Sequence, residues 1–121
     1  MSKTDRGPRL KKDLPTPEEV AEEVYRVGSK NGVEPLKVIV FGSYASDDYT
    51  SESDADVVVV SSEIDEDDFY ARSYYWMWDW DYDIYPELDL IVLRPDEFED
   101  FKSREHHIVS TAVETGLAFD F

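Results

Sequence analysis

The sequence contains no cysteine, few basic residues and no long apolar run. Because there is no thiol, a disulfide framework, a cysteine nucleophile and a cysteine-based zinc site are excluded. The apolar runs reach only about five residues, whereas a membrane-spanning helix needs roughly 18. The first 14 residues carry charge but lack the apolar core of a signal peptide. We therefore expect a cytoplasmic protein that has no membrane partner.

Basic residues are scarce: 12 Lys and Arg stand against 29 Asp and Glu, a formal charge of −17. Residues 1–12 nevertheless carry a charge of +4, from Lys3, Arg6, Arg9, Lys11 and Lys12 against Asp5. The rest of the chain then has a charge of −21, which repels nucleic acids and anionic membranes. We do not expect a nucleic-acid partner. A high-salt cytoplasm, in which ions screen the self-repulsion, is our hypothesis for this composition, and an acidic protein from an ordinary organism is the alternative.

The length of 121 residues and the 41% hydrophobic content indicate one domain with a real core. Residues 1–13 are predicted to form a flexible basic tail, and residues 14–121 a single domain. Thr16, Pro17 and Glu19 indicate a helix start with a capping box, and the helix should end between Gly28 and Gly32.

Short runs of apolar residues predict buried strands at 37–41, 57–60 and 88–93. The acidic residues 63–68 are predicted to open a helix, because carboxylates favour a first helical turn. A last helical region should begin at Pro95 and end at Gly116, followed by a short edge strand at 117–121. Its predicted buried side consists of Phe98, Phe101, Ile108, Ala112 and Val113. Helices that alternate with short buried strands predict an α/β-type layered domain, and this pattern leaves open whether the sheet is parallel or mixed.

The most informative segment is the polar loop between the first two predicted strands. Gly42 allows a sharp turn and close approach to a ligand, and Ser43 adds a hydroxyl to the free amides of a phosphate cradle. Ten residues later, Asp54 and Asp56 fall on one side of a strand. Two carboxylates this close repel each other unless a cation lies between them, and Mg²⁺ prefers such oxygen ligands. A plain strand-ending turn and a solvated acidic turn are the alternatives.

A third acid, Asp89, interrupts an apolar strand (LDLIVL). A carboxylate inside a buried strand is costly unless it is paired or metal-bound. Asp89 is therefore predicted to bind a second metal ion or to take the proton from an attacking hydroxyl.

The Gly-Ser turn, the ten-residue spacing, Asp-x-Asp and the later strand aspartate resemble the DNA polymerase β-like nucleotidyltransferase superfamily. The short chain is similar to its minimal nucleotidyltransferase branch. The resemblance covers Val38–Val60, Leu88–Phe98 and, loosely, Ile108–Phe121. It implies a nucleotidyltransferase fold, which is an α+β domain with a small mixed sheet, and we expect helices to cover one side of that sheet. It also implies transfer of a nucleoside monophosphate, with ATP as the expected donor, to a hydroxyl. Many minimal members are antitoxins encoded beside a HEPN ribonuclease toxin, and some add AMP to a tyrosine of that toxin.

The resemblance also implies roles for single residues. Asp54 and Asp56 would hold two Mg²⁺ ions, Asp89 would be the third catalytic carboxylate, and Gly42 and Ser43 would contact the β- and γ-phosphates. The chain departs from the pattern after the turn, where many members have Arg and Gly but this sequence has Ser46 and Asp47. The loop is made still more acidic by Asp48 and Glu52. The candidate cations that would compensate are Arg72, Arg94, Lys102 and Arg104.

Residues 69–85 contain nine aromatic side chains, which indicate either a protein interface or core packing. Neighbouring His106 and His107 would point to different sides of a helix, so a surface position is expected and a shared metal is not. There is no Gly-x-Ser-x-Gly elbow of a serine hydrolase. A non-catalytic antitoxin that buries the active surface of a toxin is the second hypothesis. A homodimeric enzyme acting on a small molecule is the third.

Overall fold

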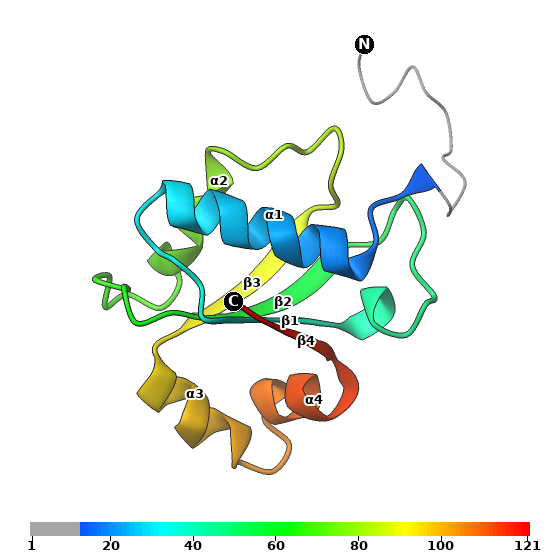
Figure 1. Ribbon diagram of the computed structural model, residues 1–121. Coiled ribbons are helices and arrows are strands. Elements are labelled where there is room, and N and C mark those ends of the chain that lie inside the picture. Colours follow the sequence, from blue (N-terminus) through cyan, green and yellow to red (C-terminus); the bar gives the residue numbers. More distant parts are fainter. Residues whose placement is uncertain (1–12) are drawn as a thin grey trace.

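The computed structural model describes residues 13–121, in which four strands form one mixed sheet (Figure 1). The strands are β1 (Lys37–Phe41), β2 (Ala55–Val60), β3 (Leu88–Leu93) and β4 (Leu117–Asp120), in the order β3-β2-β1-β4. β1 is antiparallel to β2 and β4, whereas β2 and β3 are parallel. The predicted α+β class with a mixed sheet is confirmed. The predicted tail falls, apart from Asp13, on residues 1–12, outside the described residues.

Helices cover both faces of this sheet, so the prediction that they cover one side is wrong. In Figure 1, α1 (Pro17–Lys30) and α2 (Tyr74–Met77) lie on one face, and α3 (Pro95–Lys102) and α4 (Ile108–Thr115) on the other. Side chains alternate along β1: Val38 and Val40 join the core on the α1 face, and Ile39 and Phe41 join that on the α4 face. Among the helices of residues 13–121, none has both the length and the apolar character that a bilayer crossing needs.

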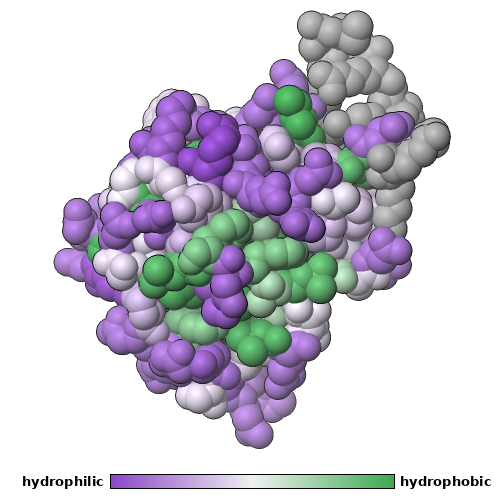
Figure 2. Space-filling view, viewed as in Figure 1, coloured by the Kyte–Doolittle hydropathy of each residue, from purple (hydrophilic) through white to green (hydrophobic). Residues whose placement is uncertain are grey.

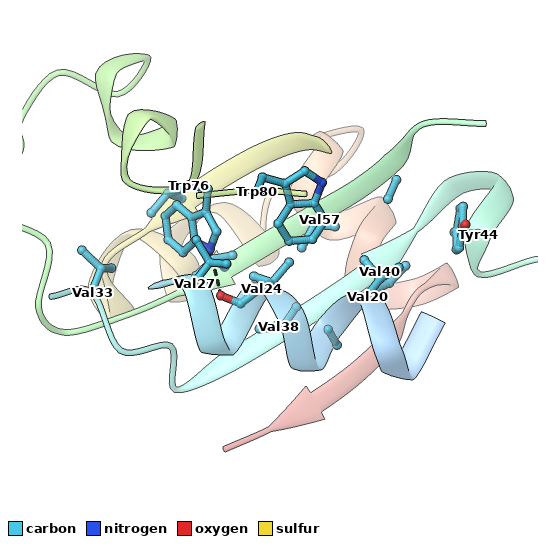
Figure 3. Close-up of a cluster of buried hydrophobic side chains, with 14 of the residues drawn as sticks. Val20, Val24, Val27, Val33, Val38, Val40, Tyr44, Val57, Trp76 and Trp80 are labelled. Carbon is cyan, nitrogen blue, oxygen red and sulfur yellow. Dashed lines mark hydrogen bonds between the residues drawn. The ribbon is translucent and has the colours of Figure 1, made fainter. Parts of the chain in front are cut away.

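The first helix begins and ends as the sequence predicts. Thr16 caps it and forms the capping box with Glu19. Its valines pack against the sheet in the cluster drawn in Figure 3. Trp76 closes this cluster: its Nε1 donates a hydrogen bond to the carbonyl of Val24 at 2.8 Å (Figure 3). Since a buried indole needs an acceptor, this bond lets Trp76 lie 1% exposed in the core.

Two helix predictions are wrong. Residues 63–68 form no helix, because Glu66 and Asp68 accept hydrogen bonds from nearby turn amides instead. The last helical region is interrupted, since residues 103–107 separate α3 from α4 and His106 has φ +60°. The break changes the helical phase: Ile108 and Val113, both predicted to be buried, are 52% and 44% exposed.

The two edges of the sheet differ in their surroundings. β4 forms one edge, and an apolar area gathers on the face of the molecule where β4 lies (Figure 2). Exposed apolar residues on or beside this strand are Leu36, Leu117 and Phe121. β3 forms the other edge. The C-terminal end of β1 and the N-terminal ends of β2 and β3 meet at one end of the sheet, which is where the polar loop lies.

Candidate functional site

The strand register brings the three predicted carboxylates to one end of the sheet. Asp56 in β2 lies opposite Phe41, the last residue of β1, and opposite Asp89 in β3. Asp54 immediately precedes β2 and is close enough for its charge to act on Asp56. Asp54 lies 12 positions after Gly42, and Asp89 lies 35 positions after Asp54. Asp89 reaches this end of the sheet because β3 pairs in parallel with β2.

The carboxylates are close enough to affect one another. The pKa of Asp56 is raised, first by its partial burial and then by the negative charges of Asp89 and Asp54; a side-chain hydrogen bond with Asp89 acts in the same direction. Asp54 and Asp89 themselves are exposed. The prediction that Asp89 lies inside a buried strand is therefore wrong. β3 is an edge strand, so its N-terminal half has neighbours on one side only.

Gly42 is required at the turn for two physical reasons. Its φ is +70°, a conformation that residues with a Cβ rarely adopt. A Cβ at this position would also collide with Oδ2 of Asp56. The predicted sharp turn is confirmed as the 3-10 turn η3 (Gly42–Tyr44). The turn and the Asp56 carboxylate are therefore in direct contact, which the spacing in the sequence does not reveal.

Two buried tyrosines fix the loop that follows the turn. The rings of Tyr44 and Tyr49 stack with their centroids 4.1 Å apart. Closer to Asp54, the Thr50 amide donates to Oγ of Ser53 at 2.9 Å, and the Ser53 amide donates to the carbonyl of Thr50. Sequence analysis missed these supports, although the two tyrosines were a signal, as isolated aromatics in a polar stretch.

Comparison with known proteins adds evidence of another kind. The chain matches the family profile described as "Nucleotidyltransferase domain" over residues 17–117. The chain belongs to this family. A solved structure from Sulfolobus solfataricus, described as a provisional nucleotidyltransferase, is 30% identical, with 73% of this chain and 80% of that chain covered and a TM-score of 0.46. No curated protein matches.

The basic residues of this nucleotidyltransferase domain are committed to other partners. Each of the seven Lys and Arg side chains in residues 13–121 forms an ion pair with a carboxylate. Arg72, 1% exposed, pairs with Glu97 and donates to the carbonyl of Val92, near the C-terminal end of β3. Arg94, Lys102 and Arg104 pair with Asp67, Glu99 and Asp100. The structure therefore does not support our prediction that one of these four cations compensates for the acidic loop.

The two histidines have separate positions. His106 is exposed, as predicted. His107 is half-buried and structural: its Nδ1 accepts a hydrogen bond from the Val109 amide at the start of α4, and its ring stacks on Phe101 at 4.7 Å.

The donor set of the nucleotidyltransferase domain fits a divalent cation in its chemistry. Three carboxylates share one end of the sheet, and after burial the negative charges of Asp89 and Asp54 contribute to the raised pKa of Asp56. A bound cation relieves such repulsion, and carboxylate oxygens are the ligands that Mg²⁺ prefers. As the side chains lie, no three His, Asp or Glu residues within 13–121 converge as ligands of one ion. The carboxylates would have to turn toward a common point to bind one.

The shifted pKa of Asp56 predicts a measurable pH dependence. In a carboxyl-detected NMR titration, Asp56 should titrate at higher pH than an ordinary aspartate, and Asp67 at lower pH, because Arg94 lowers the pKa of Asp67. Protonation and cation binding compete, so Mg²⁺ should move the Asp56 titration to lower pH and leave Asp67 unchanged. If Asp56 titrated below Asp67, the described clustering of carboxylates would be wrong.

Proposed function

We propose that this domain transfers a nucleoside monophosphate, AMP with ATP as the expected donor, to a hydroxyl group in a Mg²⁺-dependent reaction. The observation that carries the proposal is the register that sets Asp56 between the Gly42 turn and Asp89. The family match supports nucleotidyl transfer in general. The Mg²⁺ dependence, the donor base and the acceptor are proposed beyond this general activity.

Each residue has a role that its position suits. Asp54, Asp56 and Asp89 would hold Mg²⁺, two ions in all. Bound Mg²⁺ would neutralise phosphate charge and favour departure of pyrophosphate. The amides of the η3 turn and the hydroxyl of Ser43 would bind the β- and γ-phosphates. Because Gly42 has no Cβ, the phosphates can approach the backbone closely beside Asp56.

The chemical step is an in-line substitution at the α-phosphorus. The acceptor oxygen forms a bond to this phosphorus, and the bond from the phosphorus to the oxygen bridging to the β-phosphate breaks. Pyrophosphate leaves with that electron pair. The proton of the acceptor hydroxyl passes to the carboxylate of Asp89, which is exposed and therefore within reach of an acceptor from outside.

The proposed acceptor is a partner protein, a HEPN-type toxin, so that the domain acts as its antitoxin. The exposed aromatics of residues 69–85 support a protein partner, since Tyr70 and Trp78 are 89% and 85% exposed. The other two tryptophans of the segment, Trp76 and Trp80, are core residues. The resemblance of the Gly-Ser and Asp-x-Asp motifs to minimal nucleotidyltransferases supports the choice of toxin.

The test is a transfer assay with the purified protein, ATP, Mg²⁺ and the product of the neighbouring gene, read by intact-mass spectrometry. We expect a mass gain of one or more AMP units on the partner, and none when EDTA replaces Mg²⁺. No gain on either protein, in low or high salt, would contradict the proposed reaction.

A non-catalytic antitoxin is the second candidate, and the acidic loop favours it. The positions after the turn hold Ser46 and Asp47, and Asp47, Asp48 and Glu52 are all exposed there. Negative charge weakens attraction for a triphosphate. A pure binder would neutralise the toxin through the exposed aromatics alone. A dimeric enzyme for small molecules is not favoured by any described contact.

We also propose that the protein works at high salt. All seven basic residues of the described range are already paired, so the remaining acidic side chains repel one another. The Debye length falls from about 10 Å at 0.1 M to about 3 Å at 1 M salt. The free energy of unfolding, measured by urea denaturation, should therefore rise as KCl increases between these concentrations.

Sucrose at matched osmolality is the control for this salt titration, because it stabilises proteins without screening charges. KCl should stabilise the fold more than sucrose does. Full stability in salt-free buffer would overturn the high-salt proposal.

A further inference from the structure

A cavity of about 580 Å³ runs along the outer edge of β3. β3 contributes residues 88–91 to its lining. Trp76, Met77 and Trp80 line it from the α1 side of the sheet, and Phe101 and Ile108 line it from the α4 side. The cavity therefore lies at the margin of the sheet, between the layers that cover its two faces, and it includes Asp89 of the candidate site.

The main chain of β3 presents hydrogen-bonding groups to this cavity. The carbonyls of Glu87 and Leu93 accept hydrogen bonds from Ala55 and Ser61, so the main chain of these two residues faces β2. Main-chain groups alternate in direction along a strand, so those of Leu88 and Leu90 face away from β2. These groups lie at the open edge of the sheet.

Two side chains close the ends of this open edge. Arg72 Nη1 donates to the carbonyl of Val92 at 3.0 Å, and Trp80 Nε1 donates to the carbonyl of Pro86 at 2.9 Å. Both carbonyls point to the outer side of the strand, as the alternation requires. Between them, the main-chain groups of Leu88 and Leu90 and the amide of Val92 are left at the outer side of the strand. This length suits the pairing of a short extended peptide, and it is too short for the edge of another large sheet.

We infer that this groove docks an extended segment of the acceptor protein, which pairs with the main chain of Leu88 and Leu90 and carries its hydroxyl side chain to Asp89. The inference rests on the proposed function. Edge strands readily add a peptide strand, with main-chain bonds giving affinity and side-chain pockets giving specificity. Exposed apolar side chains at the groove, such as Met77 at 46% and Ile108 at 52%, provide those pockets.

The negative charge near the groove indicates which residues the docked segment carries. Asp81 and Glu87 are exposed, and each is the sequence neighbour of a residue that lines the groove, Tyr82 and Leu88. With a net charge of −17 on the whole chain, the fitting segment carries Lys or Arg near its hydroxyl residue and apolar residues beyond it. A second copy of this chain would bring the same excess of negative charge into the groove and is disfavoured.

The decisive variant is Leu90→Pro. The amide of Leu90 faces the cavity, so proline removes a donor from the open edge without breaking a bond to β2. Met77→Glu is a second variant, which changes the apolar lining and keeps the backbone. Leu36→Glu is the matched control, because Leu36 has the same 46% exposure and lies beside the other edge of the sheet.

The probes are synthetic peptides of about ten residues, roughly 33 Å when extended, with a central Tyr, Ser or Thr between Lys and apolar residues. Binding is measured by fluorescence polarisation, and AMP transfer to the peptide by mass spectrometry. We expect affinity to fall about tenfold or more in Leu90→Pro and Met77→Glu, and to be unchanged in Leu36→Glu. Hydrogen exchange of the Leu88 and Leu90 amides should slow when the wild-type protein binds peptide.

The outcomes separate this inference from the proposed function. If Leu90→Pro and Met77→Glu bind and modify peptides like the wild type, the groove is overturned and the transfer reaction stands. If the Leu88 and Leu90 amides are protected by peptide but no AMP is transferred, the groove stands and the proposed function fails. If no peptide binds, or if sedimentation shows a dimer in which these amides are already protected, the inferred occupant is wrong.

Discussion

Asparagine at both Asp54 and Asp56 is expected to abolish nucleotidyl transfer while the domain stays folded. The two carboxylates are proposed to carry the cations, and an amide oxygen binds Mg²⁺ without neutralising its charge. We expect a loss of about 10³-fold or more in transfer rate, equivalent to about 4 kcal/mol of transition-state stabilisation. The measurement is single-turnover AMP transfer to the partner protein at saturating Mg²⁺ and ATP.

The matched control is Asp65→Asn together with Asp67→Asn. These residues have the same spacing and are both exposed, and Asp67 only pairs with Arg94 at the surface. The control removes the same charge and should keep the transfer rate. Neutralisation of the toxin decides between the two functional candidates, because a catalytic antitoxin loses it in Asp54→Asn/Asp56→Asn and a pure binder keeps it.

The same substitution tests the electrostatic description of the site. Because the pKa of Asp56 is raised in the fold, the folded state takes up a proton more readily than the unfolded state. Ionised Asp56 therefore destabilises the metal-free protein at neutral pH, and protonation as the pH falls stabilises it. Asparagine imitates the protonated form, so the variant should melt at least as high as the wild type in EDTA. A lower melting temperature in the variant would contradict the claim that ionised Asp56 destabilises the metal-free fold.

Alanine at Gly42 should reduce transfer by about 100-fold, the size of effect that a displacement of about 1 Å has on catalytic groups. The added Cβ would collide with Oδ2 of Asp56 and push this carboxylate out of place. The positive φ adds strain of about 1–2 kcal/mol to the folded state. Transfer rate and the free energy of unfolding are measured together.

Gly32→Ala separates strain from collision. Gly32 has φ +85°, so alanine is strained there too, but nothing lies within 4 Å of the added Cβ. This control should lose stability like Gly42→Ala and keep its transfer rate. Equal transfer rates in the two variants would show that the contact between Gly42 and Asp56 does not position the carboxylate.

Local signals predicted the elements whose structure is decided locally. The Thr16 and Glu19 capping box gives the start of α1, and the apolar runs at 37–41 and 88–93 give β1 and β3 with their correct bounds. The second strand begins at Ala55, two residues before its prediction. In each case the pattern lies within the element itself, and the tertiary contacts of that element agree with it.

Features that depend on strand order were not predicted. The apolar run around Asp89 predicts burial on both sides, yet β3 is an edge strand. The acidic residues 63–68 favour a first helical turn, yet Arg72 and Arg94 bind the carbonyls of Ile64 and Glu66 and hold the segment extended. The spacing in the sequence predicted the residues of the candidate site. It did not predict the stacking of Tyr44 and Tyr49 or the contact of Gly42 with Asp56, because these arise from tertiary packing.

The parallel pairing of β2 and β3 has a consequence for how the site assembles. β1 and β2 are joined by residues 42–54, whereas β3 joins β2 only after the longer connection 61–87 has closed. Loop closure costs more entropy as the loop lengthens, so the hairpin with Asp54 and Asp56 can nucleate before Asp89 arrives. β3 is an edge strand, so it can separate from β2 in a local opening without breaking the pairing of β1 and β2. Such an opening would remove both Asp89 and the docking groove from the site, while the η3 turn keeps its structure.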